Sequence, residues 1–468
     1  MADVIIKTFT TPRGYYVYDR ETNSLLNVLE EEFDAFRRVE AGEATEKDWL
    51  QLKRYTEQGY LKETVLEEIE HPASQFMRDN LDSGIEQLTM CATQLCGLRC
   101  SYCTYSGNYE HQRSHSDKSM SLEMMKKCVD FIMARSRNIA DATISFYGGE
   151  PLLAIENIIA CIEYVKTEYQ GRKTTISLTS NGVVFNEKII RFLEKNDVGV
   201  AISLDGPKHV HDKSRVFADG KGSFDTVISN LHYIRESYPE FYDKLSFLAT
   251  AGPGVNVKDV VDFYNDANLF SNKPITLNTI NSHNSKFDVY YDDLFHIPYR
   301  YQVLKKLLAE LGLYSNDKLS PLFANNFLRT KDIYKSLSGS MRSKSHPGGP
   351  CLPGIMRPFV DVSGNIFACE KVSEESQVMI IGHIDTGFDY DKVDAVLNVG
   401  RLTESVCKKC WAFNHCNLCV AACDGGDSLS AKIRLENCYT AIDDCMEELR
   451  KICLLMENEY NFSRFYHS

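Results

Sequence analysis

The sequence predicts an α/β fold, in which a partial (β/α)6 barrel lies between a small N-terminal winged-helix unit and a loop-rich C-terminal domain. Three observations support this prediction. The middle of the chain alternates short β-branched segments with amphipathic helical patterns, which is typical of βα units on a parallel sheet. Strand and helix signals precede this part, and proline, glycine and cysteine crowd the part that follows it. The expected domains are the N-terminal unit at residues 1–75, the barrel at 80–290, a helical connection at 291–345 and the C-terminal domain at 346–468.

The N-terminal unit begins with a predicted hairpin, whose strands are residues 15–18 and 25–28. A first helix follows over 30–40. A second helix opens with Thr45 and Asp48, which have the spacing of a capping box. A strand pair followed by short helices is typical of a winged-helix unit.

Six strands and five helices are expected in the partial TIM-like barrel. The strands are 87–91, 142–146, 174–179, 199–204, 245–249 and 274–279, and the helices are 122–134, 155–169, 187–195, 224–234 and 257–267. A complete eight-unit barrel or an open doubly wound sheet has the same periodicity. All three arrangements place chemistry at the C-terminal ends of the strands.

Composition and charge exclude several classes of protein. With 43% apolar and 25% charged residues, the chain has the composition of a globular protein rather than a disordered one. Its 65 acidic and 52 basic residues give a formal charge of −13, which repels nucleic acid and anionic membranes alike. No signal peptide or membrane-spanning run is visible, so we expect a cytoplasmic protein without nucleic-acid or membrane partners.

Sixteen cysteines in a reducing compartment favour metal binding over disulfides. Cys96, Cys100 and Cys103 follow the first barrel strand directly. Three thiolates on one short loop can hold three irons of a 4Fe-4S cube and leave the fourth iron open. S-adenosylmethionine can chelate such an open iron through its amino and carboxylate groups. The alternatives are a zinc loop or three unrelated buried cysteines.

From residue 88 to about 280 the chain resembles the radical S-adenosylmethionine (radical SAM) superfamily. Gly148, Gly149 and Glu150 follow the second strand and look like the superfamily's GGE motif. The resemblance implies that the two glycines let the backbone approach the methionyl amino group and that Glu150 adds a negative partner. An ordinary tight turn is the alternative for the glycine pair.

Further cofactor contacts are expected at the ends of the next strands. Short polar side chains there can bond the ribose and the methionyl carboxylate, an arginine can clamp that carboxylate, and a tyrosine can pack by the adenine. Taken singly, each of these residues can equally be a cap, turn or surface residue. The candidates are Ser180 and Asn181, Ser203 and Asp205, Arg215, and Tyr102.

The C-terminal cysteines resemble the SPASM extension of radical SAM enzymes, which binds two auxiliary 4Fe-4S clusters, although paired C-x2-C loops also occur in zinc ribbons. The resemblance implies an outer cluster on Cys407, Cys410, Cys416 and Cys438, and an inner cluster on Cys351, Cys369 and Cys423. In the family the third dense cysteine is followed by another after three residues, whereas here cysteines follow after two and after six. Either Cys419 supplies the fourth ligand of the inner cluster, or the fourth iron of that cluster stays open and binds a substrate thiolate. The resemblance implies three clusters in all.

Five other cysteines are expected to be core residues, because free cysteine packs as a small hydrophobe. They are Cys91, Cys128, Cys161, Cys445 and Cys453.

The whole set of parts resembles the thioether-forming maturases of sactipeptides and ranthipeptides, which join a cysteine sulfur to a carbon through a 5'-deoxyadenosyl radical. This implies a precursor peptide whose leader adds a strand to the N-terminal unit, and a reduced donor such as flavodoxin or ferredoxin. The alternatives are an anaerobic sulfatase-maturating enzyme, a carbon–carbon crosslinking maturase, and a non-catalytic regulator whose clusters are structural or redox-sensing. For the N-terminal unit, the alternatives to peptide binding are DNA binding and a purely structural role. No residue stands out as a general base.

Overall fold

The computed structural model describes residues 4–348 and 351–466. Its largest sheet has ten strands in the order β10-β9-β8-β7-β6-β5-β12-β13-β14-β15, and the first six of these are parallel to one another. All six predicted strands are confirmed: β5 (Gln87–Thr93), β6 (Ala142–Gly148), β7 (Thr174–Ser180), β8 (Gly199–Ser203), β9 (Ser246–Ala251) and β10 (Ile275–Thr279).

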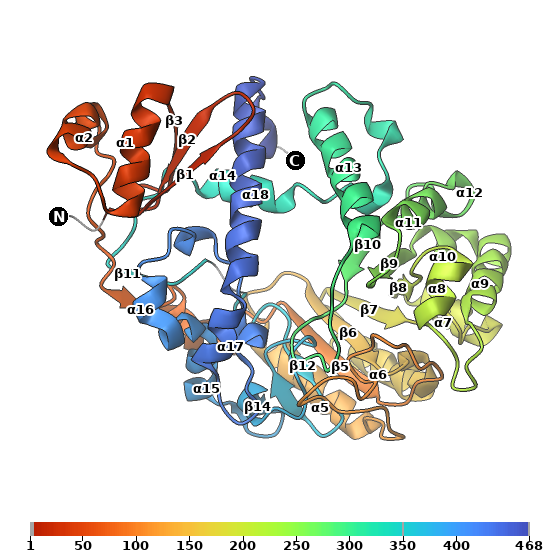
Figure 1. Ribbon diagram of the computed structural model, residues 1–468. Helices are drawn as coiled ribbons and strands as arrows, with labels where there is room; N and C mark the ends of the chain where they lie inside the picture. The colour runs from red at the N-terminus through yellow and green to blue at the C-terminus, as the bar shows by residue number, and fades with distance from the viewer. Residues whose placement is uncertain (1–3, 349–350, 467–468) are drawn as a thin grey trace.

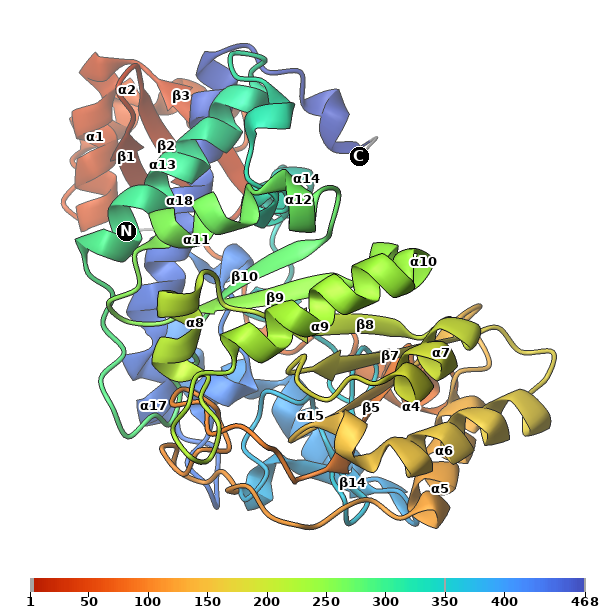
Figure 2. The same ribbon diagram turned by 90° about the vertical axis from the view of Figure 1, so that its right-hand side faces the viewer.

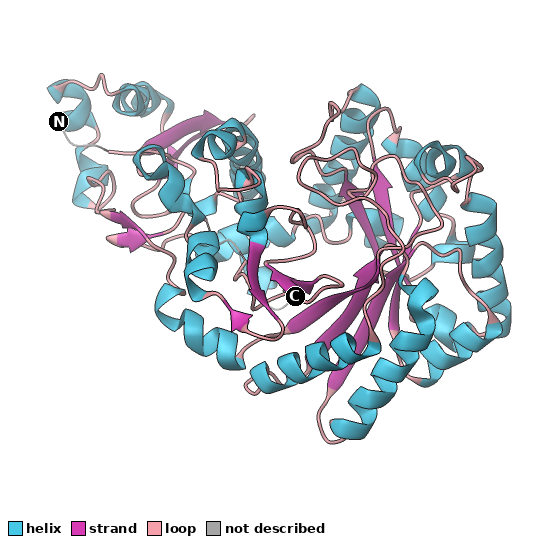
Figure 3. Cartoon of the chain, turned by 90° about the horizontal axis from the view of Figure 1, so that it is seen from below, coloured by secondary structure: helices cyan, strands magenta, loops and turns pink. Residues whose placement is uncertain are grey.

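Helices line the outer side of this parallel sheet, which Figure 3 shows as an arc of strands and Figure 2 shows from the side. They are α5 (Leu122–Arg135), α6 (Ile155–Glu168), α7 (Glu187–Lys195), α8 (Lys208–Ser214), α9 (Phe224–Ser237), α10 (Pro239–Asp243), α11 (Val257–Tyr264) and α12 (Ala267–Phe270). The prediction of a single helix over 257–267 is wrong at its C-terminal end, because the structure has two helices there, α11 and α12. Asn265 and Asp266, which favour caps and turns over helix interiors, separate α11 from α12.

The N-terminal unit is a three-stranded antiparallel sheet followed by three short helices. The predicted hairpin and the capping box of Thr45 and Asp48 are confirmed, but a strand ahead of the hairpin was not predicted. The elements are β1 (Ile6–Thr10), β2 (Tyr15–Asp19), β3 (Ser24–Val28), α1 (Glu30–Ala41), α2 (Glu46–Gln51) and α3 (Lys53–Glu57).

Both faces of this small sheet are covered. One face packs on its own helices through Val17, Leu26 and Phe36. The other face packs Tyr16 and Tyr18 against the long C-terminal helix α18 (Cys438–Glu457). Figure 1 shows α18 standing directly beside the N-terminal unit, which is therefore fixed to the C-terminal part of the chain.

The connection after the barrel is mostly helical, as predicted. Short strands follow this connection and extend the main sheet beyond β5. The sequence predicts only loops here, because strands of two to four residues are too short to show the alternation of a β-strand. The elements are α13 (Asp293–Glu310), α14 (Leu328–Ser336), β12 (Phe359–Val360), β13 (Asn365–Phe367), β14 (Ile380–His383), β15 (Gly387–Phe388), α15 (Tyr390–Leu397), α16 (Glu404–Cys407) and α17 (Ala431–Glu436). Two further short strands, β11 (Lys344–Ser345) and β4 (Glu68–Ile69), pair with each other. The helix α4 (Met77–Ser83) precedes β5. In the described part of the chain, no helix has both the length and the apolar character needed to cross a membrane.

Candidate functional site

The first three cysteines lie on one loop at the C-terminal end of β5. Cys100 is buried, and Cys96 and Cys103 are half-buried and close enough for the charges of all three thiolates to interact. The backbone N–H groups of Leu98 and Tyr105 donate to the sulfurs of Cys96 and Cys103, each over 3.4 Å. Burial raises the pKa of the Cys100 thiol to about 12. Three convergent sulfurs with N–H donors fit a cube that is ligated at three corners.

The glycine pair after β6 packs against this cysteine loop. A Cβ on Gly148 would lie 2.2 Å from the carbonyl oxygen of Thr93, and a Cβ on Gly149 would lie 2.2 Å from that of Leu95. The N–H groups of Gly149 and Glu150 donate to the same two carbonyls, over 2.7 and 2.8 Å. The glycines are therefore required for close contact between the two loops, a reason that differs from the expected approach to a cofactor.

Glu150 is completely buried and joins the end of β6 to the end of β7. Its carboxylate accepts hydrogen bonds from the Leu152 N–H (3.2 Å), the Ser180 hydroxyl (3.0 Å) and the Asn181 N–H (2.7 Å). Burial raises the pKa of Glu150 to about 7, against these hydrogen bonds. The Asn181 amide in turn reaches the sulfur of Cys96 at 3.7 Å, so this group borders the cysteine loop.

A second polar group forms at the end of β8 around Asp205. Its carboxylate accepts hydrogen bonds from the Tyr102 hydroxyl (2.5 Å), the Arg215 Nε (3.0 Å) and the Thr250 N–H (3.0 Å). The Arg215 guanidinium also lies over the Tyr102 ring, 5.4 Å from its centroid. The Asp205 N–H donates to Nδ1 of His211, whose pKa burial lowers to about 4, so the imidazole is neutral.

The structure thus gathers most of the predicted cofactor residues into two groups around the cysteine loop. Ser203 belongs to neither group: it lies at the end of β8, and its side chain makes no hydrogen bond to the described residues. The two terminal nitrogens of Arg215 make no hydrogen bond to the described residues, because only its Nε donates to Asp205. A buried arginine fork beside the three cysteines suits a carboxylate. The first group is Gly148, Gly149, Glu150, Ser180 and Asn181, and the second is Tyr102, Asp205 and Arg215.

The cysteines that the resemblance assigns to an outer cluster lie within electrostatic range of one another. The charge of Cys410 interacts with those of Cys407, Cys416 and Cys438, and Cys438 interacts with Cys407 and Cys416. Cys407 ends α16, and Cys438 is the first residue of α18. Two helices and the segment between them therefore carry the four cysteines of this set.

The inner set contains one more sulfur than the three that the resemblance assigns to it. Cys419 interacts electrostatically with both Cys351 and Cys369, and Cys423 interacts with Cys419 and with Cys416 of the outer set. The sequence left the place of Cys419 open, and the structure puts it beside the inner set. Across residues 4–348 and 351–466, no three His, Cys, Asp or Glu side chains are grouped closely enough to hold a single metal ion.

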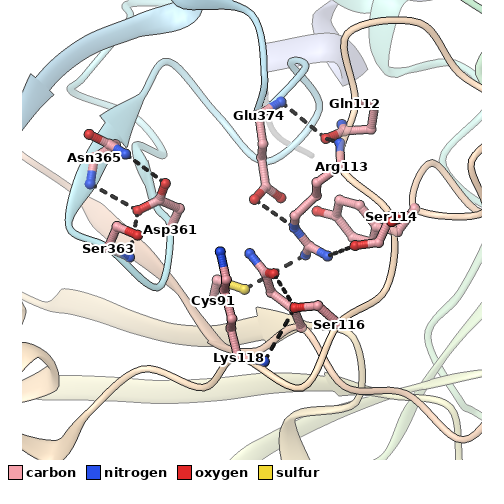
Figure 4. Close-up of polar contacts among 12 residues, drawn as sticks. Cys91, Gln112, Arg113, Ser114, Ser116, Lys118, Asp361, Ser363, Asn365 and Glu374 are labelled. Atoms are coloured by element: carbon pink, nitrogen blue, oxygen red, sulfur yellow. Dashed lines mark hydrogen bonds and ion pairs between the residues drawn. The ribbon is translucent and has the colours of Figure 1, made fainter.

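A buried ion pair joins the loop after the first cysteines to the loop after Cys369, and sequence reasoning missed it. Figure 4 shows Arg113 pointing toward Glu374, with an Nε to carboxylate distance of 2.7 Å, and toward the sulfur of Cys91 at 3.7 Å. The guanidinium also stacks on the Tyr105 ring, 3.6 Å from its centroid. The two partners are 261 residues apart, so no local pattern reveals the pair.

The five cysteines expected in the core are all fully buried, which confirms that prediction. Three lie in the barrel core, and two lie on α18 against the N-terminal sheet. They are Cys91, Cys128 and Cys161, and Cys445 and Cys453.

Residues 90–267 match the family model of the radical SAM superfamily, and this range holds the cysteine loop and both polar groups. The chain contains a radical SAM domain. A cysteine-type anaerobic sulfatase-maturating enzyme from Clostridium novyi is 34% identical over 162 residues, which cover 34% of this chain and 42% of that enzyme. The radical SAM cyclopropyl synthase TigE from Paramaledivibacter caminithermalis is 23% identical over 273 residues, or 54% of each chain. These matches span about half or less of each relative's length.

The radical SAM domain and the parts around it also have a counterpart among solved structures. A structure described as native anSMEcpe with bound AdoMet superposes with a TM-score of 0.57 at 19% identity, covering 79% of this chain and 98% of that one. At this identity the likeness shows the fold alone. It extends beyond the barrel, since the coverage exceeds the length of the radical SAM domain.

Proposed function

We propose that this chain is a radical SAM peptide maturase that joins a cysteine sulfur to a carbon of another residue in a ribosomally made peptide. One observation carries the proposal. The N-terminal sheet is packed on α18, the helix that begins at Cys438 of the outer cysteine set. The proposed peptide-binding unit and the proposed metal-binding region thus share one helix, which suits a substrate held at one place and modified at another.

The residues of the radical SAM domain fit the cofactors expected there. Cys96, Cys100 and Cys103 would hold a 4Fe-4S cluster, and Arg215, aligned by Asp205, would bind the methionyl carboxylate. When bound, S-adenosylmethionine and the reduced cluster supply the 5'-deoxyadenosyl radical. The buried walls of the site exclude water from the reacting groups. The proposed reductant is a flavodoxin or ferredoxin, and the proposed compartment is the cytoplasm.

Two auxiliary clusters complete the proposed cofactor set. Cys419 would be the fourth inner ligand, because it lies beside Cys351 and Cys369. Replacing Cys419 by alanine is then expected to lower the iron content from about twelve to about eight per chain, at four irons per cube. Cys445→Ala, a change in a buried core thiol, serves as the control and should leave the iron content unchanged. A full iron content in Cys419→Ala would instead favour an iron that is left open for a substrate thiolate.

The leader of the peptide would add to β3. The outer side of β1 is occupied, since the Thr8 N–H donates to Glu40 of α1 over 2.8 Å, whereas β3 pairs only with β2 in the described structure. Leu29, directly after β3, is 51% exposed. An open strand edge that ends in an exposed leucine suits an extended peptide.

This docking can be tested by a point substitution. Deleting residues 1–75 would uncover the apolar face of α18, so Leu29→Asp is a cleaner test. We expect it to weaken binding of a leader peptide about tenfold, which corresponds to about 1.4 kcal/mol of apolar contact. Leu313→Asp alters a leucine that is 71% exposed on a distant loop and should have no effect. Equal binding by both variants would exclude β3 as the docking edge.

Formylglycine formation is the second candidate, and the match to a cysteine-type anaerobic sulfatase-maturating enzyme favours it. Mass spectrometry after anaerobic incubation with a cysteine-containing peptide encoded beside this chain separates the candidates. A thioether removes two hydrogens and leaves the sulfur resistant to alkylation, whereas formylglycine formation removes the sulfur. A carbon–carbon crosslink removes two hydrogens and leaves an alkylatable thiol. Loss of sulfur would contradict the proposal.

A further inference from the structure

The charges of four buried arginines are balanced in two different ways. Arg434 is completely buried on α17, and no carboxylate lies within ion-pair distance of it in the described part of the chain. The other three arginines each pair with a carboxylate: Arg20 with Glu21, Arg113 with Glu374, and Arg215 with Asp205. Burying a cation without an anionic partner is strongly unfavourable, so Arg434 requires a negative charge from another source.

The contacts of Arg434 point to sulfur as that source. Its Nη1 donates to the sulfur of Cys423 over 3.5 Å, and its Nε donates to the hydroxyl of Thr403 over 3.1 Å. Because that hydroxyl already accepts a hydrogen bond from Nε, its own hydrogen is free to point at the sulfur of Cys407, 3.1 Å away. The remaining nitrogen, Nη2, is buried and has no partner in the structure.

These contacts place Arg434 between the two cysteine sets. Cys423 belongs to the proposed inner set and Cys407 to the outer set. Each set would carry net negative charge as a thiolate-ligated cluster, and net charge and hydrogen bonds to sulfur are two of the factors that fix the reduction potential of such a cluster. The arginine is thus in contact with both sets at once, directly on one side and through Thr403 on the other.

We propose that Arg434 is a shared counter-charge that raises the reduction potentials of both auxiliary clusters, an inference that rests on the clusters of the proposed function. Reduction adds a negative charge to a cluster, and a nearby fixed positive charge favours that form. Arg434 is therefore a positioning and tuning residue that does not touch the substrate. Its unpartnered Nη2 remains available as a further donor toward either set.

The test is an EPR-monitored potentiometric titration of the full, anaerobically reconstituted chain. Cys96, Cys100 and Cys103 are replaced by alanine in every sample, so that all signals come from the auxiliary clusters. The variants are Arg434→Gln, Arg434→Lys and Thr403→Val. Arg401→Gln is the control, because Arg401 lies in the same region but is half-exposed and pairs with Asp394.

We expect Arg434→Gln to lower the equilibrium constant for reduction of each cluster at least tenfold, which is about 59 mV for a one-electron couple. Arg434→Lys should keep potentials close to the parent, because it keeps the charge. Thr403→Val should lower the potential of the outer cluster alone, and Arg401→Gln should change neither potential.

Unchanged potentials in Arg434→Gln would overturn the inference. If that variant does not fold, Thr403→Val decides, and an unchanged outer potential there would overturn the inference equally. A parent chain that holds no iron after reconstitution would refute the auxiliary clusters themselves. A parent with about eight irons and unmoved potentials in the variants would refute only the role of Arg434.

Discussion

The two cysteine-bearing regions of this molecule are built in opposite ways. At the barrel mouth, three sulfurs lie on one loop that is held in place by the ends of long parallel strands. In the C-terminal region, eight sulfurs come from loops, short helices and the start of α18, among strands of only two to four residues. The first region has a scaffold of long parallel strands, whereas the stretch from Cys407 to Cys438 consists of short helices and loops.

Buried charge shows the same difference. At the barrel mouth, Arg215 is balanced by the carboxylate of Asp205. In the C-terminal region, the guanidinium of Arg434 donates to a cysteine sulfur and a threonine hydroxyl, and it pairs with no carboxylate of the described residues. The charge of the buried arginine at the barrel mouth is therefore balanced within the polypeptide, while that of Arg434 requires additional negative charge.

The largest expected effect is the loss of chemistry when the first cysteines are removed. Replacing Cys96, Cys100 and Cys103 by alanine should abolish 5'-deoxyadenosine production, measured by chromatography, because these residues alone would hold the cluster that meets S-adenosylmethionine. The same protein should keep about eight irons in its auxiliary clusters. A variant that still forms 5'-deoxyadenosine would show that the cluster lies elsewhere, and a wild-type chain that forms none would favour a non-catalytic regulator.

Removal of iron should separate the two regions next most strongly. After chelation, we expect hydrogen exchange to accelerate most in residues 407–438, since metal binding is also folding energy where only short helices and loops surround the cysteines. The strands of the barrel should keep their protection, because their core does not depend on metal. Equal acceleration in both regions would contradict the contrast.

A smaller effect is expected at the contact between the glycine pair and the cysteine loop. Gly149→Ala should destabilise the protein by about 1–3 kcal/mol, because its Cβ would meet the carbonyl oxygen of Leu95 and one loop must shift. The shift should also weaken S-adenosylmethionine binding, measured by equilibrium dialysis. Gly171→Ala, where a Cβ would meet nothing within 4 Å, is the matched control. Identical stability in the two variants would argue against the contact.

The sequence predicts the barrel better than the rest, for a physical reason. Periodicity located all six strands because each is long enough to alternate, and the three cysteines follow the first strand within a few residues. Long-range contacts leave no such pattern, so the pair of Arg113 and Glu374, 261 residues apart, could not be derived from spacing. The strand over residues 359–360, which pairs with β5, was missed because two residues show no period. Convergence of Cys419 on Cys351 and Cys369 likewise depends on loops that only the fold brings together.

The last effect is confined to acidic pH and concerns the neutral His211. Burial lowers its pKa from 6.5 to about 4, so between these values the unfolded chain binds a proton that the folded chain does not. The contribution of His211 to the free energy of unfolding is constant above pH 6.5 and falls by about 3 kcal/mol as the pH drops from 6.5 to 4. His211→Asn should flatten this part of the stability curve, measured by denaturant unfolding, whereas His209→Asn, at an exposed position, should leave it unchanged. An equal slope in His211→Asn and the wild type would contradict the assignment.

The most direct test of the account is an EPR titration of the reduced protein with S-adenosylmethionine. If the loop of Cys96, Cys100 and Cys103 leaves one iron corner free for this ligand, its addition should change the spectrum of the first cluster and leave the signals of the auxiliary clusters as they were. A spectrum that does not respond to saturating S-adenosylmethionine would contradict the account.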